Sequence, residues 1–327
     1  MMSDRVSVLV IFYNQEEYVD TALESVFSQK TDFGVKVIVG DDGSSDGTCD
    51  AVNRWIERFP DRIELHVMPR GEGKQIPGFR ASKNRLELLK YVDTEYFIYL
   101  DGDDYFCNEM KLQKQLGILD RKENSDCIAC GHNTCKLFKD GTRIPATDPS
   151  LAEGKIDPKE FWKICYVHTD ALLFRSSFIP HIEYDLLENS FNDIMITFSA
   201  LLYGKIYYFP ETWAVYLQTN DGIWTSGNEV VNLVRNLIFC DLALRIKPEY
   251  RMQTRCRFAF LWKGLYRIRK SIDMASLKPY YDEARDKNCK NAMLWCRYPK
   301  LNVFRKCGLA LKTFAVSCSE PFLRHFF

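Results

Sequence analysis

Four short apolar runs, separated by amphipathic segments, occupy the first third of this chain of 327 residues. The runs are rich in β-branched and aromatic side chains, which favour strands. They cover residues 5–12, 35–40, 62–68 and 97–101. Between them, apolar residues recur at the spacing of an amphipathic helix, over residues 19–27, 52–59 and 84–92. Strands and helices that alternate in this way predict an α/β domain with a mostly parallel, doubly wound sheet.

Two of the predicted strands end on clustered aspartates. Residues 37–48 read VIVGDDGSSDGT, and residues 97–106 read FIYLDGDDYF. In a doubly wound sheet, ligands bind beyond the carboxyl ends of the strands. Five acids are therefore expected to converge on one cleft, namely Asp41, Asp42, Asp101, Asp103 and Asp104.

Carboxylates this close together repel one another, so a positive partner is expected among them. Oxygen ligands suit Mg²⁺ or Mn²⁺, and either ion can bridge to a diphosphate. A solvated acidic loop is the alternative to a metal site. The chain has FYNQEEY where a dinucleotide-binding domain would have its glycine-rich loop, and it contains no P-loop. These two nucleotide-binding classes are therefore disfavoured.

The cysteines and the N-terminus indicate a reducing compartment. Twelve cysteines are scattered along the chain, and no N-x-S/T sequon occurs. The segment 127–135, CIACGHNTC, has a spacing that resembles a zinc site, but it also reads as a strand, and no second C-x-x-C follows. We favour the strand. No secretion signal and no window of 18 uncharged apolar residues is found, so a cytoplasmic location is expected.

Charge is balanced over the whole chain, with 44 basic and 44 acidic residues, which argues against a nucleic-acid partner. The distribution is uneven, because residues 245–327 contain 19 Lys and Arg but only 6 Asp and Glu. Helical spacing of apolar residues over 233–244 and 258–268 predicts a helical cap. Residues 295–316 mix aromatic, aliphatic and basic side chains, a pattern typical of an interfacial helix on anionic lipid. Basic helices that pack on the acidic body are the alternative.

Three stretches together resemble the opening half of glycosyltransferase family 2, whose members have the GT-A fold. They are VSVLVIFYNQEEYVDTALESVFSQ, VIVGDDGSSDGT and YFIYLDGDDYF, and HTDALLFRS and FNDIMITFSALLYGKIYYFPETWAVYLQ extend the likeness more thinly. The resemblance implies a catalytic domain over residues 1–228. A nucleotide-sugar half would cover residues 1–120, an acceptor half residues 121–228 and a basic helical region residues 229–327. Within the family, the chain is most similar to bacterial enzymes that build capsule or lipopolysaccharide.

The resemblance also implies a donor site for a nucleotide sugar, with UDP-sugars favoured. Asp42 matches the acid that hydrogen-bonds the uracil ring, with Asp41 beside it. Asp101, Asp103 and Asp104 match the DxD region, in which Asp101 and Asp103 would face the donor and Asp103 and Asp104 the Mn²⁺ or Mg²⁺ ion. Five further residues are expected near the donor. Phe12, Tyr13 and Asn14 would lie near the base, and Lys83 or Arg80 would face the diphosphate.

On the acceptor side, Asp193 matches the catalytic base of the family. Taken alone, an Asp immediately before IMITFSALLY also reads as a helix N-cap. His168, Asn192 and Trp224 are candidates for contacts with the acceptor. A histidine at the start of a strand and a buried tryptophan are the structural alternatives for His168 and Trp224.

The implied activity is an inverting hexosyl or N-acetylhexosaminyl transfer to a glycan or lipid-linked glycan in surface polysaccharide synthesis. The basic tail would hold the enzyme at the inner face of the cytoplasmic membrane. Two rivals are a sugar-binding protein that has kept a GT-A shell without activity, and a nucleotidyltransferase. The intact acids favour an enzyme, and VIVGDDGSSDGT speaks against the nucleotidyltransferase.

Overall fold

The computed structural model describes residues 3–70, 75–157, 167–219, 228–301, 305–306 and 308–309. The chain divides into two compact units, Met1–Thr219 and Asn220–Phe327. The predicted boundary after residue 228 lies slightly beyond this division, and residues 220–227 are outside the described ranges.

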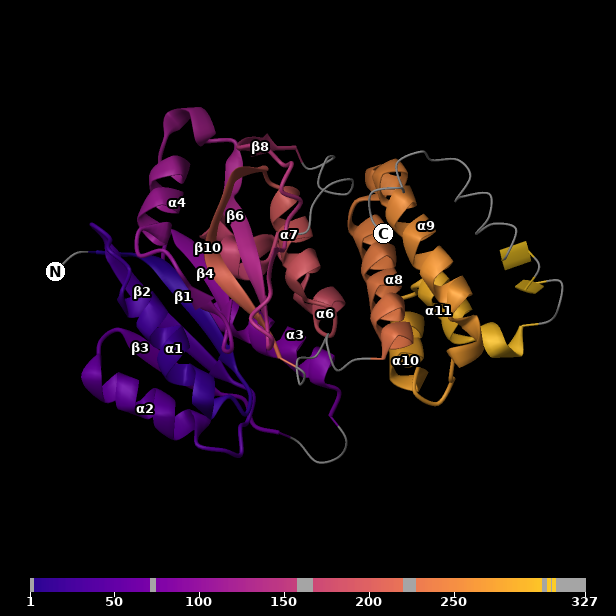
Figure 1. The fold of residues 1–327 in the computed structure, drawn as a ribbon. Coiled ribbons are helices and arrows are strands. Elements are labelled where there is room, and N and C mark those ends of the chain that lie inside the picture. Colours follow the sequence, from indigo (N-terminus) through magenta and orange to yellow (C-terminus); the bar gives the residue numbers. More distant parts are fainter. Residues whose placement is uncertain are drawn as a thin grey trace. The chain divides into compact units, whose positions relative to one another are not determined.

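The first half of unit one is a parallel sheet with helices on both faces (Figure 1). Its strands are adjacent in the order β3-β2-β1-β4, all parallel. Their bounds are β1 Asp4–Phe12, β2 Gly34–Asp41, β3 Ile63–Val67 and β4 Tyr96–Asp101. The predicted alternation of strands and helices is confirmed here. The connecting helices are α1 Glu16–Phe27, α2 Thr48–Arg58 and α3 Pro77–Leu88.

Alternation of side chains along the strands assigns the helices to the two faces of the sheet. Val8 and Ile98 belong to the core formed with the apolar sides of α1 and α2. Tyr99, the neighbour of Ile98, points the other way and donates a hydrogen bond to the carbonyl of Arg85 on α3. Sequence spacing predicted this last helix over residues 84–92. It begins earlier, at Pro77, because the fixed φ of proline suits a first helical turn, and it passes into a 3₁₀ turn at Leu89–Tyr91.

The second half of the sheet is mixed and continues as β9-β6-β10-β5. Strand β10 runs parallel to β6 and antiparallel to β5. These strands are β5 Tyr105–Phe106, β6 Cys127–Phe138, β9 Leu173–Arg175 and β10 Lys205–Gln218, with short partners β7 Arg143–Pro145 and β8 Gly154–Ile156. The helices of this half are α4 Lys111–Leu119, α6 Tyr184–Leu187 and α7 Asp193–Leu201, and 3₁₀ turns cover Lys122–Asn124, Thr169–Ala171 and Ser176–His181.

The CIACGHNTC segment forms the first part of β6, as predicted. Cys127, Cys130 and His132 are buried, and a hydrogen-bond contact of the His132 ring is made with the backbone of Asn133. The three cysteines of this segment, Cys127, Cys130 and Cys135, are free thiols.

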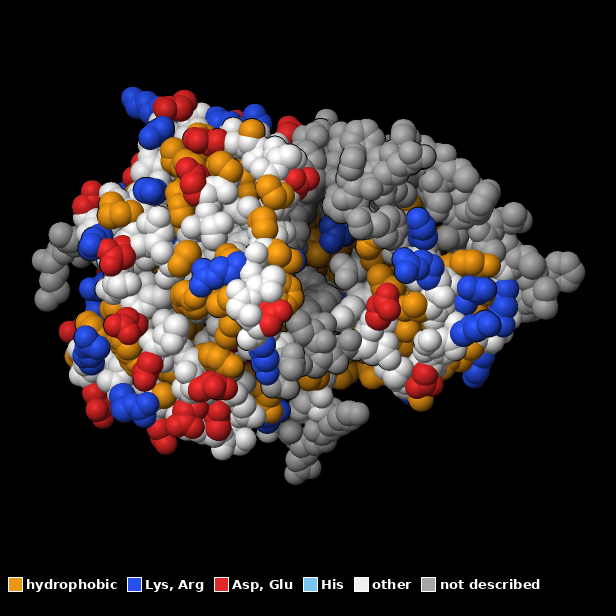
Figure 2. Space-filling view, viewed as in Figure 1, with side chains coloured by type: hydrophobic (Ala, Val, Ile, Leu, Met, Phe, Trp, Pro, Cys, Tyr) orange, Lys and Arg blue, Asp and Glu red, His pale blue; other side chains and the backbone are white. Residues whose placement is uncertain are grey.

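Unit two is helical, with α8 Glu229–Ile246, α9 Arg251–Arg267, α10 Lys278–Asp286 and α11 Lys290–Cys296, joined through short 3₁₀ turns at Pro248–Tyr250 and Arg269–Ser271 and followed by one at Tyr298–Lys300. The predicted helical spacing is confirmed, since Leu237 of α8 and Leu265 of α9 are fully buried. Trp295 is a correction: it is buried in α11, which ends at Cys296, so it does not begin a lipid-facing helix. In the view of Figure 2, Lys and Arg predominate over Asp and Glu on this unit.

Across the described ranges, no helix combines the length and the apolar character needed to cross a bilayer.

Candidate active site

Strand register brings the predicted acids to one edge of the sheet. Phe12 at the end of β1 lies beside Asp41 at the end of β2, and Ile11 lies beside Asp101 at the end of β4. Asp42 follows Asp41 directly. The expected convergence of the two acidic loops is therefore a consequence of parallel pairing around β1.

Asp42 is the centre of a basic and aromatic cluster at this edge. It is 5% exposed, and its carboxylate lies 2.5 Å from Arg80 and 3.3 Å from Arg70. Arg70 lies over the ring of Tyr13, 3.8 Å from its centroid, and donates to its hydroxyl at 2.7 Å. Arg80 thus pairs with Asp42, the acid predicted to bind the uracil ring. Arg70 is a second partner of Asp42, and the sequence did not predict it.

Asp41, Asn14 and Phe12 shape the loops around this cluster. Both oxygens of Asp41 accept hydrogen bonds from Ser44, at 2.8 Å from its amide and 2.5 Å from its hydroxyl. Asn14 has a positive φ of 49° and accepts from the amide of Ser45 at 2.8 Å. Phe12 is fully buried. In this structure the side chains of Asp41 and Asn14 therefore hold the loops in place, and Phe12 belongs to the core.

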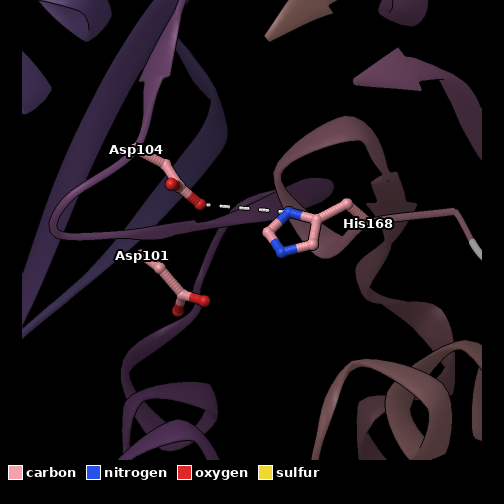
Figure 3. A group of neighbouring side chains, drawn as sticks. All are labelled: Asp101, Asp104 and His168. Carbon is pink, nitrogen blue, oxygen red and sulfur yellow. Dashed lines mark ion pairs between the residues drawn. The ribbon is translucent and has the colours of Figure 1, made fainter. Parts of the chain in front are cut away.

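The DGDD loop carries a buried carboxylate with one oxygen unsatisfied. Asp104 is 1% exposed, and its Oδ1 accepts from the amide of Leu217 on β10 at 2.9 Å. Its Oδ2 has no hydrogen-bond partner within the described ranges and lies 4.0 Å from His168 Nδ1 (Figure 3). Burial, together with the charges of Asp103 and others, raises the pKa of Asp104 well above its usual range. For Asp103, burial and then Asp101 raise the pKa to about 6.

His168 lies among these acids. It is 2% exposed, its Nδ1 is 2.9 Å from Asp170 Oδ1 and its Nε2 is 3.8 Å from Asp193 Oδ2. The ring stacks on Tyr216 with centroids 4.3 Å apart. Burial lowers the pKa of His168, but the carboxylates of Asp170, Asp193 and Asp104 outweigh it and raise the pKa to about 10. Asp170 and Tyr216 were not among the predicted residues.

Arg85 provides the buried cation between the two acidic groups. It is 9% exposed and donates to both oxygens of Asp101, at 2.6 and 2.9 Å, while its Nη2 lies 3.4 Å from Asp193. Burial lowers the pKa of Arg85, but Asp101 and Asp193 give a net increase. Lys83, the predicted cation, is partly exposed and pairs with Glu188 at 2.8 Å. The sequence offers no local signal that separates Arg85 from Lys83, two residues earlier on the same helix.

Asn192, and not Asp193, caps helix α7. The side-chain oxygen of Asn192 accepts from the amide of Met195 at 3.0 Å, and Asp193 is the first helical residue. The alternative role of Asp193 as the N-cap is therefore wrong. Its carboxylate instead meets Arg85 and His168. Trp224 lies outside the described residues, so the structure places no acceptor contact there.

Three of these side chains fit a divalent cation. Asp101, Asp104 and His168 each offer one ligand atom, and the three atoms lie within 4.8 Å of one another. The unpartnered Asp104 Oδ2 is the observation that favours a cation, because a buried carboxylate oxygen without a donor is costly. The predicted pair was Asp103 and Asp104; the geometry groups Asp104 with Asp101 and His168 instead.

Comparisons with known proteins show which sequences and folds this chain is similar to. An uncharacterised protein of Mycobacterium tuberculosis is 28% identical over 222 residues, which is 68% of this chain and 61% of that protein. An uncharacterised glycosyltransferase of Nostoc is 25% identical over 65% of this chain and 64% of its own length. The chain thus spans somewhat less than two thirds of these relatives.

Among solved structures, S. aureus TarS residues 1–349, in complex with UDP-GlcNAc, superposes with a TM-score of 0.56 at 16% identity, covering 90% of this chain and 92% of that one. This likeness shows the GT-A fold. The family model named Glycosyl transferase family 2 matches residues 7–182, which is more than half of the chain. The protein belongs to glycosyltransferase family 2.

Proposed function

We propose that this protein transfers a sugar from a nucleotide sugar, with UDP-sugars favoured, to a hydroxyl group of a cell-surface glycan, with inversion at the anomeric carbon. One observation carries the proposal: Arg85 bridges Asp101, at the end of β4, and Asp193, at the start of α7. A donor-side acid and a base are thereby held at the same edge of the sheet. Family membership supports a glycosyltransferase.

The donor end of the proposed site is the cluster around Asp42. The carboxylate of Asp42 would accept from the ring N–H of uracil, and the exposed ring of Tyr13 would stack on the base. TarS was solved with UDP-GlcNAc, which supports a UDP-sugar as the donor. The proposed transferred sugar is a hexose or an N-acetylhexosamine.

Asp101, Asp104 and His168 would hold Mn²⁺ or Mg²⁺ beside the diphosphate. When bound, the ion would neutralise charge that develops on the departing nucleoside diphosphate. Asp103, between Asp101 and Asp104 in the loop, is the remaining acid for the donor, and burial followed by the charge of Asp101 raises its pKa.

Asp193 would act as the general base. It would take the proton of the acceptor hydroxyl while that oxygen bonds to the anomeric carbon, and the bond from this carbon to the diphosphate oxygen would break with its electrons leaving on the diphosphate. The N-terminus of α7 and the cation Arg85 both favour the ionised carboxylate that this step needs. Asn192 supports the base by capping the helix that carries it.

The acceptor class is supported by a partial relative. The poly(ribitol-phosphate) β-glucosyltransferase of Bacillus spizizenii is 25% identical over 112 residues, or 33% of this chain. A polymer of the cell surface, in lipid-linked form or not, is therefore the proposed acceptor. A sugar-binding protein without activity remains the rival, since it would share the donor site but show no turnover.

The test is a screen of UDP-sugars for donor hydrolysis with Mn²⁺, followed by Asp193→Asn. Loss of the base should lower turnover by about 10²- to 10⁴-fold. Affinity for UDP, measured by calorimetry, should change less than twofold, because Asp193 lies on the acceptor side. Glu188→Gln, which removes a partly exposed acid paired with Lys83, is the matched control and should keep full turnover. An Asp193→Asn protein that keeps more than half of the turnover would contradict the assignment.

A further inference from the structure

Asp170 lies behind the proposed cation site and has no role in the proposed reaction. It is fully buried, in the 3₁₀ turn Thr169–Ala171 that follows His168. Its Oδ1 lies 2.9 Å from His168 Nδ1 and accepts from the hydroxyl of Thr134 at 2.8 Å. Burial of a carboxylate is costly unless partners stabilise its charge. The two contacts of Asp170 therefore indicate that this residue has a defined role in the site.

Two contacts determine how the ring of His168 is oriented. Asp170 engages Nδ1, and the ring of Tyr216 stacks on one face at 4.3 Å with an interplanar angle of 21°. Nε2 is then the nitrogen that lies toward Asp193, at 3.8 Å. Rotation of the imidazole would break the contact with Asp170 or the stack on Tyr216. The ring is therefore held with a defined nitrogen toward the reacting side of the site.

We propose that Asp170 is a positioning residue that fixes the orientation of His168 through Nδ1, which leaves Nε2 as the ring nitrogen available to the divalent cation held with Asp101 and Asp104. The inference rests on the proposed function, because the bound cation is part of that proposal. Histidines that bind metals commonly donate their other ring N–H to a carboxylate, and such carboxylates orient the ring and increase its basicity as a ligand. Asp170 Oδ1 lies 2.9 Å from His168 Nδ1, which is close enough for such a contact.

The first test compares cation-dependent binding of UDP in Asp170→Asn and in the unsubstituted protein. Titration calorimetry with Mn²⁺ should show an affinity that is about 10- to 100-fold weaker in the variant. In EDTA the two proteins should bind UDP equally and melt at similar temperatures. Thr134→Val is the matched control, since it removes the other hydrogen bond to the same oxygen without touching His168. A loss as large in Thr134→Val as in Asp170→Asn would overturn the proposal.

A double-mutant cycle tests whether Asp170 acts through His168. In a His168→Gln background, Asp170→Asn should weaken the Mn²⁺-dependent affinity less than twofold further, because the ring to be oriented is gone. An equal loss in both backgrounds would show that Asp170 acts independently and would overturn the inference. If Asp170→Asn fails to fold, ¹⁵N resonances of His168 in the unsubstituted protein decide: Mg²⁺ with UDP should shift Nε2, and a shift confined to Nδ1 overturns the inference.

The two proposals fail in different ways. If the unsubstituted protein binds UDP equally well in EDTA and in Mn²⁺, the cation site is wrong and the inference falls with it. If its binding depends on the cation while Asp170→Asn behaves like the unsubstituted protein, only the role of Asp170 is wrong.

Discussion

At the scale of single residues, Lys111 shows how much the environment decides the behaviour of a charged side chain. It is the first residue of α4 and is fully buried. Its ammonium group donates to Gln115 Oε1 at 3.0 Å and lies 4.0 Å from the centroid of the Phe106 ring. Burial lowers the pKa of Lys111 to about 7, although the charge of Asp170 works in the opposite direction. The folded protein therefore binds this proton more weakly than the unfolded chain does.

This difference predicts how stability depends on pH. Between about pH 7 and 10, the unfolded chain holds the Lys111 proton and the folded protein has released it, so the free energy of unfolding should rise with pH over this window. Relative to Lys111→Met, which cannot titrate, the unsubstituted protein should gain roughly 2 kcal/mol from pH 7 to pH 9. Urea unfolding of both proteins at the two pH values measures this change in the free energy of unfolding. A difference that stays constant or falls with pH would show that Lys111 remains charged in its buried site.

Single residues are also where prediction from the sequence fails most. The donor-side acids were predictable because DD and DGDD stand directly after apolar runs, and the ends of parallel strands meet. Arg85 and Lys83 are two residues apart on α3, and local sequence does not say which one faces the acids. Only the packing of α3 on the sheet turns Arg85 inward and leaves Lys83 with Glu188. Asp170 was missed for a similar reason: His168 is only two residues away, but Thr134, the other partner of Asp170, lies on β6, 36 residues earlier in the chain.

At the scale of elements, the turn between β4 and β5 depends on Gly102. A Cβ atom at this position would lie 2.2 Å from Phe12 Cδ1 and 2.6 Å from Gln15 Oε1, so Phe12, a buried side chain, would have to move. Overpacking of this kind commonly costs about 1–3 kcal/mol. Gly102→Ala should therefore lower the free energy of unfolding by that amount and weaken Mn²⁺-dependent binding of UDP.

Gly117 provides the matched control for this prediction. It lies inside α4, and a Cβ atom there would meet nothing within 4 Å. Gly117→Ala should raise the free energy of unfolding by about 0.5–1 kcal/mol, because alanine loses less conformational entropy in a helix. Thermal melts and calorimetry of the two variants test both statements. Equal stabilities for the two alanine variants would mean that the turn around Gly102 can rearrange at little cost in free energy.

Helices and strands were predictable where apolar residues recur with a clear period. Their first and last residues were harder to predict. The first four strands were all predicted within two residues of their ends, because β-branched runs flanked by turn residues mark a buried parallel strand. The start of α3 was missed because apolar spacing is weak in its first two turns, where buried positions include Arg80, Ser82 and Asn84. Polar residues that face a site break the pattern on which such predictions rely.

At the scale of the whole molecule, charge is unevenly distributed, with 19 Lys and Arg but only 6 Asp and Glu in residues 245–327. We expect the basic region after Arg245 to bind anionic vesicles at low salt, because each basic residue near such a surface contributes about 1 kcal/mol. Co-sedimentation with vesicles that contain phosphatidylglycerol should weaken steeply as salt rises, since screening acts within roughly 10 Å at 0.1 M.

A triple variant makes this prediction specific. Arg305→Gln, Lys306→Gln and Lys312→Gln together should reduce vesicle affinity by about two orders of magnitude, as three such charges are lost. Lys306→Arg with Lys312→Arg keeps the charge and is the control. Because Trp295 is buried, electrostatic attraction and not insertion of this ring should dominate. A protein that ignores anionic vesicles at low salt would leave the basic residues with a role in packing alone.

The bond between Leu217 and Asp104 has a consequence for the order of events during synthesis. Strand β5 pairs only with β10 among the described strands, and the two are separated by about a hundred residues of chain. Contacts this distant in sequence form late, since the loop between them must be closed first. On the ribosome, the four parallel strands can assemble while the DGDD loop still lacks its anchor. The nascent chain should therefore gain affinity for a nucleoside diphosphate and its metal only after β10 has emerged. A partly folded chain would then not bind the donor.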